Sequence, residues 1–140
     1  MIEGISLYDF DGVVSTGKFY LRPGDVIVTG RCVDEAQIVL GMLSKLGVDM
    51  IPVYFNPIML KDRGENTEKA RTISAYHKVS ICKSMLANGV KIRDCYEDDP
   101  LQLQIIKSCI RGLKIHFVEN GEINVHYSSD GRGNGGAECR

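Results

Sequence analysis

Two aspartates at the end of an apolar run are the first residues of this chain that suggest chemistry. In the segment LYDFDGVV, Asp9 and Asp11 are separated by one residue and follow a run typical of a buried strand. Charged side chains usually avoid such places, because a carboxylate is costly to remove from water. Side chains two positions apart share one side of an extended chain, so both carboxylates are expected to face one site, with Phe10 pointing away into packing.

Other polar residues follow later strands of the chain. The sequence TGR (29–31) follows the second predicted strand, EDD (97–99) follows the fourth, and Lys78 lies in the helix that precedes the fourth. Ligands of parallel α/β sheets bind at the carboxyl ends of the strands, so these groups are expected to converge. Converging carboxylates repel one another unless a divalent cation lies among them, and an all-oxygen ligand set suits Mg²⁺.

A simpler reading treats each acidic group as a turn or cap. Asp11-Gly12 and Asp99-Pro100 are both common turn dipeptides, and either pair alone is explained in that way. Both pairs occur here, however, with Thr29 and Lys78 in order between them. This order favours one shared site.

Alternating strands and helices must position these residues. Strands are predicted at Ile5–Phe10, Asp25–Thr29, Asp49–Phe55, Lys91–Glu97 and Lys114–Val118, and the segment EINVHY is expected to pair back as a hairpin. Helices are predicted at Val33–Leu46, at Arg71–Ala87 and from Pro100, with a loop over 56–70 that has at most one helical turn. Pro52 places the third strand at or near a sheet edge.

This pattern predicts a three-layer, Rossmann-like α/β fold with a mainly parallel sheet of about five strands and no cap domain. Residues 1–127 are expected to form the folded domain. Residues 128–140 are Gly-rich and are expected to form a disordered tail.

Composition limits the classes of protein that this chain can represent. The 140 residues carry 17 basic and 18 acidic side chains, a balance that provides no general attraction to nucleic acid or to anionic membranes. No run is long enough to span a bilayer and the first residues lack a secretory pattern, so a soluble cytoplasmic protein is expected. The five cysteines form no CxxC or Cys/His cluster and are expected to be buried free thiols in a reducing compartment.

Four segments in order carry a resemblance to a known family. DFDGVVSTG, VIVTGR, HKVSICKSML and YEDDP resemble the successive motifs of the haloacid dehalogenase superfamily of phosphohydrolases, over residues 5–118. The resemblance implies that Asp9 is a nucleophile that forms an aspartyl-phosphate and that Asp11 is a general acid and base.

The same resemblance implies the rest of the site. Asp9, the Asp11 carbonyl and Asp98 would hold Mg²⁺, with Glu97 or Asp99 in support. Phosphoryl oxygens would be bound by the Thr29 hydroxyl, the Gly30 N–H and Lys78.

Two features depart from the usual layout of that family. The connection between the first two motifs is short, and the only candidate lid is the loop 56–70, which is basic at Lys61, Arg63 and Lys69, with Arg71 just after it. An open site of this kind goes, within the family, with large substrates. Arg31 also points to a large substrate, because VTGR resembles the second motif of the 3′-phosphatase domain of bacteriophage polynucleotide kinase–phosphatase.

The sequence therefore predicts a Mg²⁺-dependent phosphatase whose partner is a phosphorylated substrate, with a nucleic-acid 3′-phosphate as one candidate and no membrane partner. A phosphatase for a small metabolite and a catalytically silent binding module on the same scaffold are the alternatives. A phospho-accepting receiver is disfavoured, because its phosphorylated aspartate lies on a middle strand, whereas here the acidic pair comes first.

Overall fold

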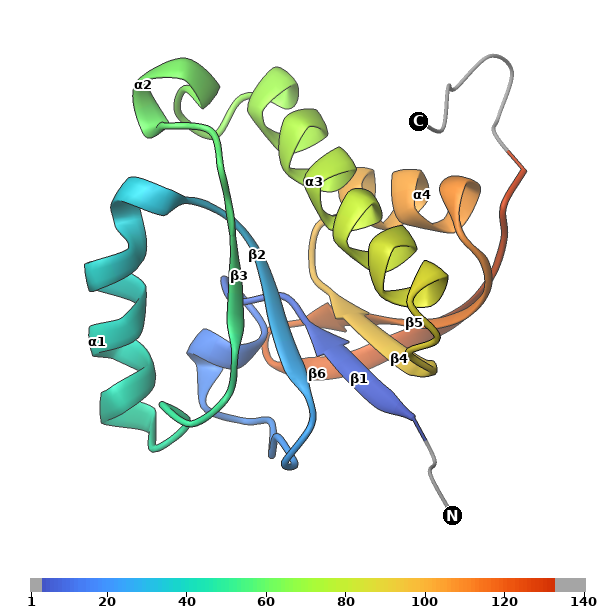
Figure 1. The fold of residues 1–140 in the computed structure, drawn as a ribbon, viewed down its shortest axis with the longest axis horizontal. Coiled ribbons are helices and arrows are strands. Elements are labelled where there is room, and N and C mark those ends of the chain that lie inside the picture. Colours follow the sequence, from blue (N-terminus) through green and yellow to red (C-terminus); the bar gives the residue numbers. More distant parts are fainter. Residues whose placement is uncertain (1–3, 133–140) are drawn as a thin grey trace.

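One mixed sheet organises the computed structural model, which describes residues 4–132. Its strand order is β3-β2-β1-β4-β5-β6 (Figure 1). The strands are β1 (Ile5–Tyr8), β2 (Val26–Cys32), β3 (Val53–Asn56), β4 (Ile92–Glu97), β5 (Arg111–Glu119) and β6 (Glu122–Asp130). The first five strands are parallel, and β6 pairs antiparallel with β5. The predicted α/β fold, its mainly parallel sheet and the C-terminal hairpin are confirmed.

Helices cover both faces of this sheet, which gives the three predicted layers. Helices α3 (Glu68–Ala87) and α4 (Pro100–Cys109) lie on one face, and α1 (Ala36–Leu46) lies on the other (Figure 1). A fourth helix, α2 (Leu60–Arg63), is a single turn within the predicted loop 56–70. Two apolar clusters fill the space between the layers, one under α3 and α4 and one under α1.

The short connection from β1 to β2 returns in parallel without an α-helix. Residues 9–25 contain only the 3₁₀ turn η1 (Val14–Thr16), yet β1 and β2 pair at Leu7↔Val26 and Tyr8↔Ile27. Apolar side chains of this connection pack under α1 in place of a helix: Phe10, Val13, Val14 and Leu21. The segment therefore completes one layer of the core, although it has few residues for a parallel crossover.

Local capping explains where the helices near the carboxyl ends of the strands begin. Helix α3 begins at Glu68, three residues before its predicted start, because the Thr67 hydroxyl accepts a hydrogen bond from the Ala70 N–H at 3.1 Å. Helix α4 begins at Pro100 as predicted, and the Asp99 carboxylate caps it by accepting the Leu101 N–H at 2.9 Å. Helix α1 begins at Ala36 after a 3₁₀ turn, η2 (Val33–Glu35).

One edge strand of the sheet agrees with the sequence prediction, and the other is longer than predicted. Strand β3 is an edge strand, as Pro52 indicated, and the carbonyl of Pro52 accepts the Ile27 N–H at 2.9 Å. Strand β6 continues to Asp130, past the expected start of the tail at Ser128. Its register is held by the Ser129 hydroxyl, which accepts the Leu113 N–H at 2.7 Å. The rest of the predicted tail, from residue 133, lies outside the described residues.

A cap domain and a membrane-spanning helix are the two accessory elements that the sequence predicts to be absent. Within residues 4–132 the chain forms no cap domain over the sheet. None of the helices in that range combines the length and the apolar composition that a bilayer span requires.

Burial along α1 provides a test of the core. Leu43 is fully buried under the sheet, whereas Leu40 on the same helix is 48% exposed. We expect Leu43→Ala to lower the free energy of unfolding by about 2–5 kcal/mol, because it leaves a cavity. Leu40→Ala is expected to change it by less than about 1 kcal/mol. Urea denaturation measures both, and equal losses would contradict this packing.

Candidate functional site

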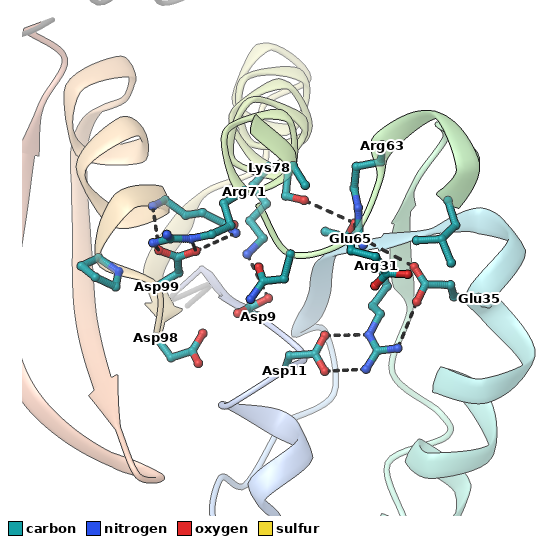
Figure 2. Close-up of a pocket in the computed structure, with 17 residues that line it drawn as sticks. Asp9, Asp11, Arg31, Glu35, Arg63, Glu65, Arg71, Lys78, Asp98 and Asp99 are labelled. Atoms are coloured by element: carbon teal, nitrogen blue, oxygen red, sulfur yellow. Dashed lines mark hydrogen bonds and ion pairs between the residues drawn. The ribbon is translucent and has the colours of Figure 1, made fainter. Parts of the chain in front are cut away.

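The carboxyl ends of β1, β2 and β4 meet the N-terminal halves of α3 and α4 around one pocket (Figure 2). Its volume is about 660 Å³. Six of the seven residues predicted for the site line it: Asp9, Asp11, Gly30, Arg31, Lys78 and Asp98. The folded chain thus brings together residues that are up to 89 positions apart in the sequence.

Lys78 is the cation at the floor of this pocket. It comes from the buried side of α3, and its Nζ lies 2.9 Å from Asp9 Oδ1 and 2.7 Å from Glu97 Oε1. Burial disfavours the charged ammonium, but the attraction of the two carboxylates outweighs it and raises the pKa of Lys78 above its usual value. The lysine is therefore charged and ties α3 to β1 and β4.

Three carboxylates share this one ammonium. Oxygen atoms of Asp9, Glu97 and Asp98 lie within 4.8 Å of one another. Burial raises the pKa of Asp9 to about 6 and that of Glu97 to about 8, despite the opposing effect of Lys78, and it also raises the pKa of Asp98. Without a further cation, the cluster must hold a proton near neutral pH, because a single ammonium does not balance three carboxylates.

Glu97 supports the cluster from below. Its Oε1 binds Lys78, while its Oε2 accepts the N–H groups of Asp98 and Asp99, each at 3.1 Å. Both oxygens of Glu97 therefore have donors. The family resemblance implied Glu97 or Asp99 in support of Asp98. Glu97 reaches Lys78 because it lies in β4 and faces α3, whereas Asp99 pairs with Arg71.

A glycine permits the acidic residues to approach. Gly12 has a φ of 76°, and a Cβ built there would lie 1.9 Å from Asp98 Oδ2. The loop after β1 and the loop after β4 can therefore touch only with glycine at this position.

The donor set of this cluster fits a hard divalent cation. All three groups are carboxylates, and oxygen ligands are those that Mg²⁺, Ca²⁺ and Mn²⁺ prefer. Asp9 and Asp98 also line the pocket, so solvent and a ligand have access to the same place. The site is a possible metal site.

Asp11 lies on the other side of the pocket mouth, beyond the reach of Lys78. Arg31 binds it with two parallel hydrogen bonds, from Nε to Oδ2 at 2.8 Å and from Nη2 to Oδ1 at 2.9 Å (Figure 2). Arg31 Nη1 also donates to Glu35 Oε2 at 3.0 Å, and these partners raise the pKa of Arg31 further. Phe10, between the two aspartates, is fully buried as predicted.

Thr29 and Gly30 occupy the end of β2. Thr29 is fully buried and does not line the pocket, and its Oγ1 accepts the Arg31 N–H at 3.0 Å. Gly30 lies against α3 so closely that a Cβ would be 2.4 Å from Ser74 Oγ. A larger residue at position 30 would separate β2 from the helix that carries Lys78.

The predicted basic rim is only partly present. Arg63 and Arg71 line the pocket, whereas Lys61 and Lys69 are exposed outside it. Arg63 Nη1 donates to the Gly30 carbonyl at 2.6 Å and lies 3.9 Å from Glu35 Oε1. Arg71 forms a bidentate ion pair with Asp99, in which Nε donates to Oδ2 at 2.8 Å and Nη2 donates to Oδ1 at 2.6 Å.

Sequence reasoning missed Glu35 and Gln102. Glu35 holds Arg31 and also accepts the Cys32 N–H at 2.9 Å, which is the reciprocal cap of the turn η2. Its spacing of three from Cys32 and four from Arg31 was the available signal. Gln102 lines the pocket and donates from Nε2 to Asp99 Oδ2 at 3.1 Å, a contact that the sequence did not indicate.

Of the four cysteines within residues 4–132, three are free thiols, and Cys109 is disulfide-bonded, contrary to the expectation of free thiols. Cys32, Cys82 and Cys95 are buried free thiols, as expected. Burial raises the pKa of Cys82 to about 11, so this thiol is protonated at neutral pH.

Comparisons with models of protein families, with curated proteins and with solved structures find no match to this chain.

The raised pKa values predict how pH and Mg²⁺ act on stability. An acid whose folded-state pKa is raised stabilises the fold at low pH, and that contribution is lost as pH rises through the folded-state value. The metal-free protein is therefore expected to lose stability from about pH 4, where Asp9 and Glu97 ionise in the unfolded chain, to about pH 8, where Glu97 ionises in the folded state. A Mg²⁺ concentration of about 100 times the dissociation constant should restore about 2.7 kcal/mol at the higher pH.

Thermal denaturation at both pH values, with and without Mg²⁺, measures this effect. Asp98→Asn is expected to weaken the Mg²⁺ effect, and Asp49→Asn, at an exposed position, is the matched control. Equal Mg²⁺ stabilisation in the two variants would contradict the metal site.

Proposed function

We propose that this chain is a Mg²⁺-dependent phosphomonoesterase of the haloacid dehalogenase type, which works through an aspartyl-phosphate at Asp9. The observation that carries the proposal is the position of Asp9. This carboxylate lies at the floor of an open pocket, with one oxygen on Lys78 and with Asp98 and Glu97 within reach of a shared cation. A buried carboxylate nucleophile needs such positive charge beside it before it can meet a phosphate dianion.

The reaction follows from the roles of the two aspartates. Asp9 attacks phosphorus, the bond from phosphorus to the leaving oxygen breaks, and Asp11 donates a proton to that oxygen. Water then attacks the aspartyl-phosphate while Asp11 accepts its proton, which releases phosphate and regenerates Asp9. Bound Mg²⁺ would neutralise charge on the phosphoryl oxygens, and Asp9, the Asp11 carbonyl and Asp98 would hold it.

Arg31 acts on this cycle through Asp11. Its two parallel hydrogen bonds hold the Asp11 carboxylate at the pocket mouth, about where the leaving group would pass. Incoming phosphoryl oxygens would attract the same guanidinium, since arginine pairs equally well with phosphate and with carboxylate. Arg31 would thus position Asp11 and then contact the substrate.

The remaining donors keep the roles that the family resemblance implies. Lys78 would donate to the phosphoryl oxygens, and Gly30, which lines the pocket, would donate its N–H to them. The Thr29 hydroxyl oxygen already accepts a hydrogen bond from the Arg31 N–H. Its contact with the substrate therefore stays a prediction.

Charge at the pocket mouth bears on the kind of substrate. Of the described residues that line the pocket, six are acidic and four are basic, and all three arginines already have acidic partners. A polyanion would have to break these pairs to gain phosphate contacts, whereas one Mg²⁺ offsets the excess of two negative charges. The pocket therefore favours a substrate with a single phosphate, although the absence of a cap leaves room for a bulky leaving group.

Loss of the nucleophile is the central test. With a generic aryl phosphate and Mg²⁺, we expect Asp9→Asn to lower kcat by about 10³-fold or more and Asp11→Asn by about 10²–10⁴-fold. EDTA should abolish turnover, and Asp49→Asn should leave it unchanged. If wild type shows no metal-dependent turnover above Asp9→Asn, the chain is the silent binding module instead.

A substrate panel tests the charge argument. Rates are compared for sugar phosphates, nucleoside monophosphates and oligonucleotides with a 3′- or 5′-phosphate. We expect kcat/KM for the single-phosphate compounds to exceed that for the oligonucleotides by about 10-fold or more, a difference of about 1.4 kcal/mol, since a polyanion would have to break several ion pairs at the pocket mouth. A preference for the 3′-phosphorylated oligonucleotide, with a strong dependence on salt, would establish the polymer substrate.

A further inference from the structure

A second cluster of titratable side chains lies on the opposite face of β4 from the carboxylate cluster of Asp9, Glu97 and Asp98. Neighbouring strands β4, β5 and β6 bring together Asp94, His116 and His126 (Figure 1 shows the strands). His116 Nε2 lies 2.8 Å from Asp94 Oδ1, and His116 Nδ1 lies 2.5 Å from His126 Nδ1. Asp94 and Glu97 are three apart on β4, so their side chains leave opposite faces of the strand and the two clusters are separate.

The hydrogen bond to Asp94 defines the chemical state of His116. An ionised carboxylate only accepts, so His116 Nε2 carries the proton of that bond. In neutral His116 the Nδ1 atom then carries no proton, and its lone pair points at the Nδ1 of His126. Two nitrogen atoms at this distance cannot both carry protons, and two lone pairs would repel, so a proton or a cation must lie between them.

The inner part of this cluster is rigid. His116 is 5% exposed and stacks on the ring of Tyr96, with ring centroids 4.6 Å apart. Asp94 accepts from Arg93 Nε at 2.7 Å. Burial alone would raise the pKa of Asp94, but the hydrogen bonds from His116 and Arg93 lower it below its usual value, which keeps the carboxylate ionised.

The outer part is open to solvent. His126 is exposed and lies on β6, the edge strand, directly opposite His116 in the register. The His126 side chain therefore lies outside the packed core, which leaves space for its ring to shift when a ligand binds.

We propose that His116 and His126 form a binding site for a divalent transition-metal ion of the zinc class, with Asp94 as a positioning residue. Imidazole nitrogen is a preferred ligand of such ions, and a metal-bound histidine usually donates its other ring N–H to a carboxylate, as His116 does to Asp94. Zinc–nitrogen bonds of about 2.0–2.1 Å require the two rings to separate by less than about 1 Å, which the exposed His126 permits. Water would complete the coordination.

This site selects a different kind of cation from the acidic cluster. Carboxylate oxygens of Asp9, Glu97 and Asp98 suit hard ions such as Mg²⁺, whereas two imidazoles suit borderline ions such as zinc. The proposal does not depend on phosphatase activity, because the two sites share no side chain.

Zinc titration of the full chain tests the proposal. Calorimetry is done with saturating Mg²⁺ in the Asp98→Asn variant, so that the acidic cluster does not take up zinc. We expect one bound Zn²⁺, and a loss of affinity of at least about 10-fold in an added His126→Gln. His126 is exposed, so this variant is expected to fold like the parent protein, and thermal denaturation checks this. His77→Gln removes a histidine outside the cluster and is expected to leave zinc affinity unchanged.

The positioning role of Asp94 needs a separate measurement. Asp94→Ala is expected to lower zinc affinity by about 10–100-fold and to shift the ring ¹⁵N signals of His116 away from the tautomer that is protonated on Nε2. Equal zinc affinity with and without His126 would overturn the site and leave a proton shared between the two rings. Unchanged His116 signals in Asp94→Ala would overturn the role of Asp94.

Discussion

The buried ion cluster around Lys78 is the interaction on which the arrangement of this protein depends. One ammonium from α3 contacts carboxylates from the ends of β1 and β4, which joins three elements that are distant in sequence. Such a cluster is a poor source of net stability, because desolvation offsets most of the Coulomb attraction. Removing one member, however, leaves an uncompensated buried charge, which typically costs about 3–5 kcal/mol. The cluster therefore fixes where the strand ends lie relative to α3.

Around this cluster, the pocket is built from paired charges and close backbone approaches. Arg31 and Arg71 each hold an aspartate with two parallel hydrogen bonds, so Asp11 and Asp99 have defined orientations. Gly12 and Gly30 allow neighbouring segments to come closer than a Cβ would permit. The result is a site whose acidic groups are held in place before any ligand binds, and pre-organisation of this kind is what an electrostatic catalyst requires.

The two faces of β4 carry two different polar sites. Glu97 faces α3 and takes part in the carboxylate cluster, while Asp94 faces the other way and orients His116. The second site lies on the face of β5 and β6 opposite α4, a face that α1 does not cover (Figure 1). An uncovered antiparallel hairpin can keep polar side chains at its surface, which a parallel strand buried on both faces cannot do.

Periodicity and turn chemistry were enough to determine the α/β class, the order of the elements and the convergence of the acidic groups. The class and the order of the elements are local features, because a strand followed by Asp-x-Asp and a helix that begins at Asp-Pro are set by neighbouring residues. The convergence of the acidic groups follows from the rule that ligands of parallel sheets bind at the carboxyl ends of the strands. The contacts between side chains were decided by tertiary structure. That Glu97 rather than Asp99 reaches Lys78, that Arg31 binds Asp11, and that His116 meets His126 depend on strand register and on which face each residue occupies. Such pairings join positions 10 to 20 residues apart, and no local pattern specifies them, because the same residue types fit several registers until the core packs.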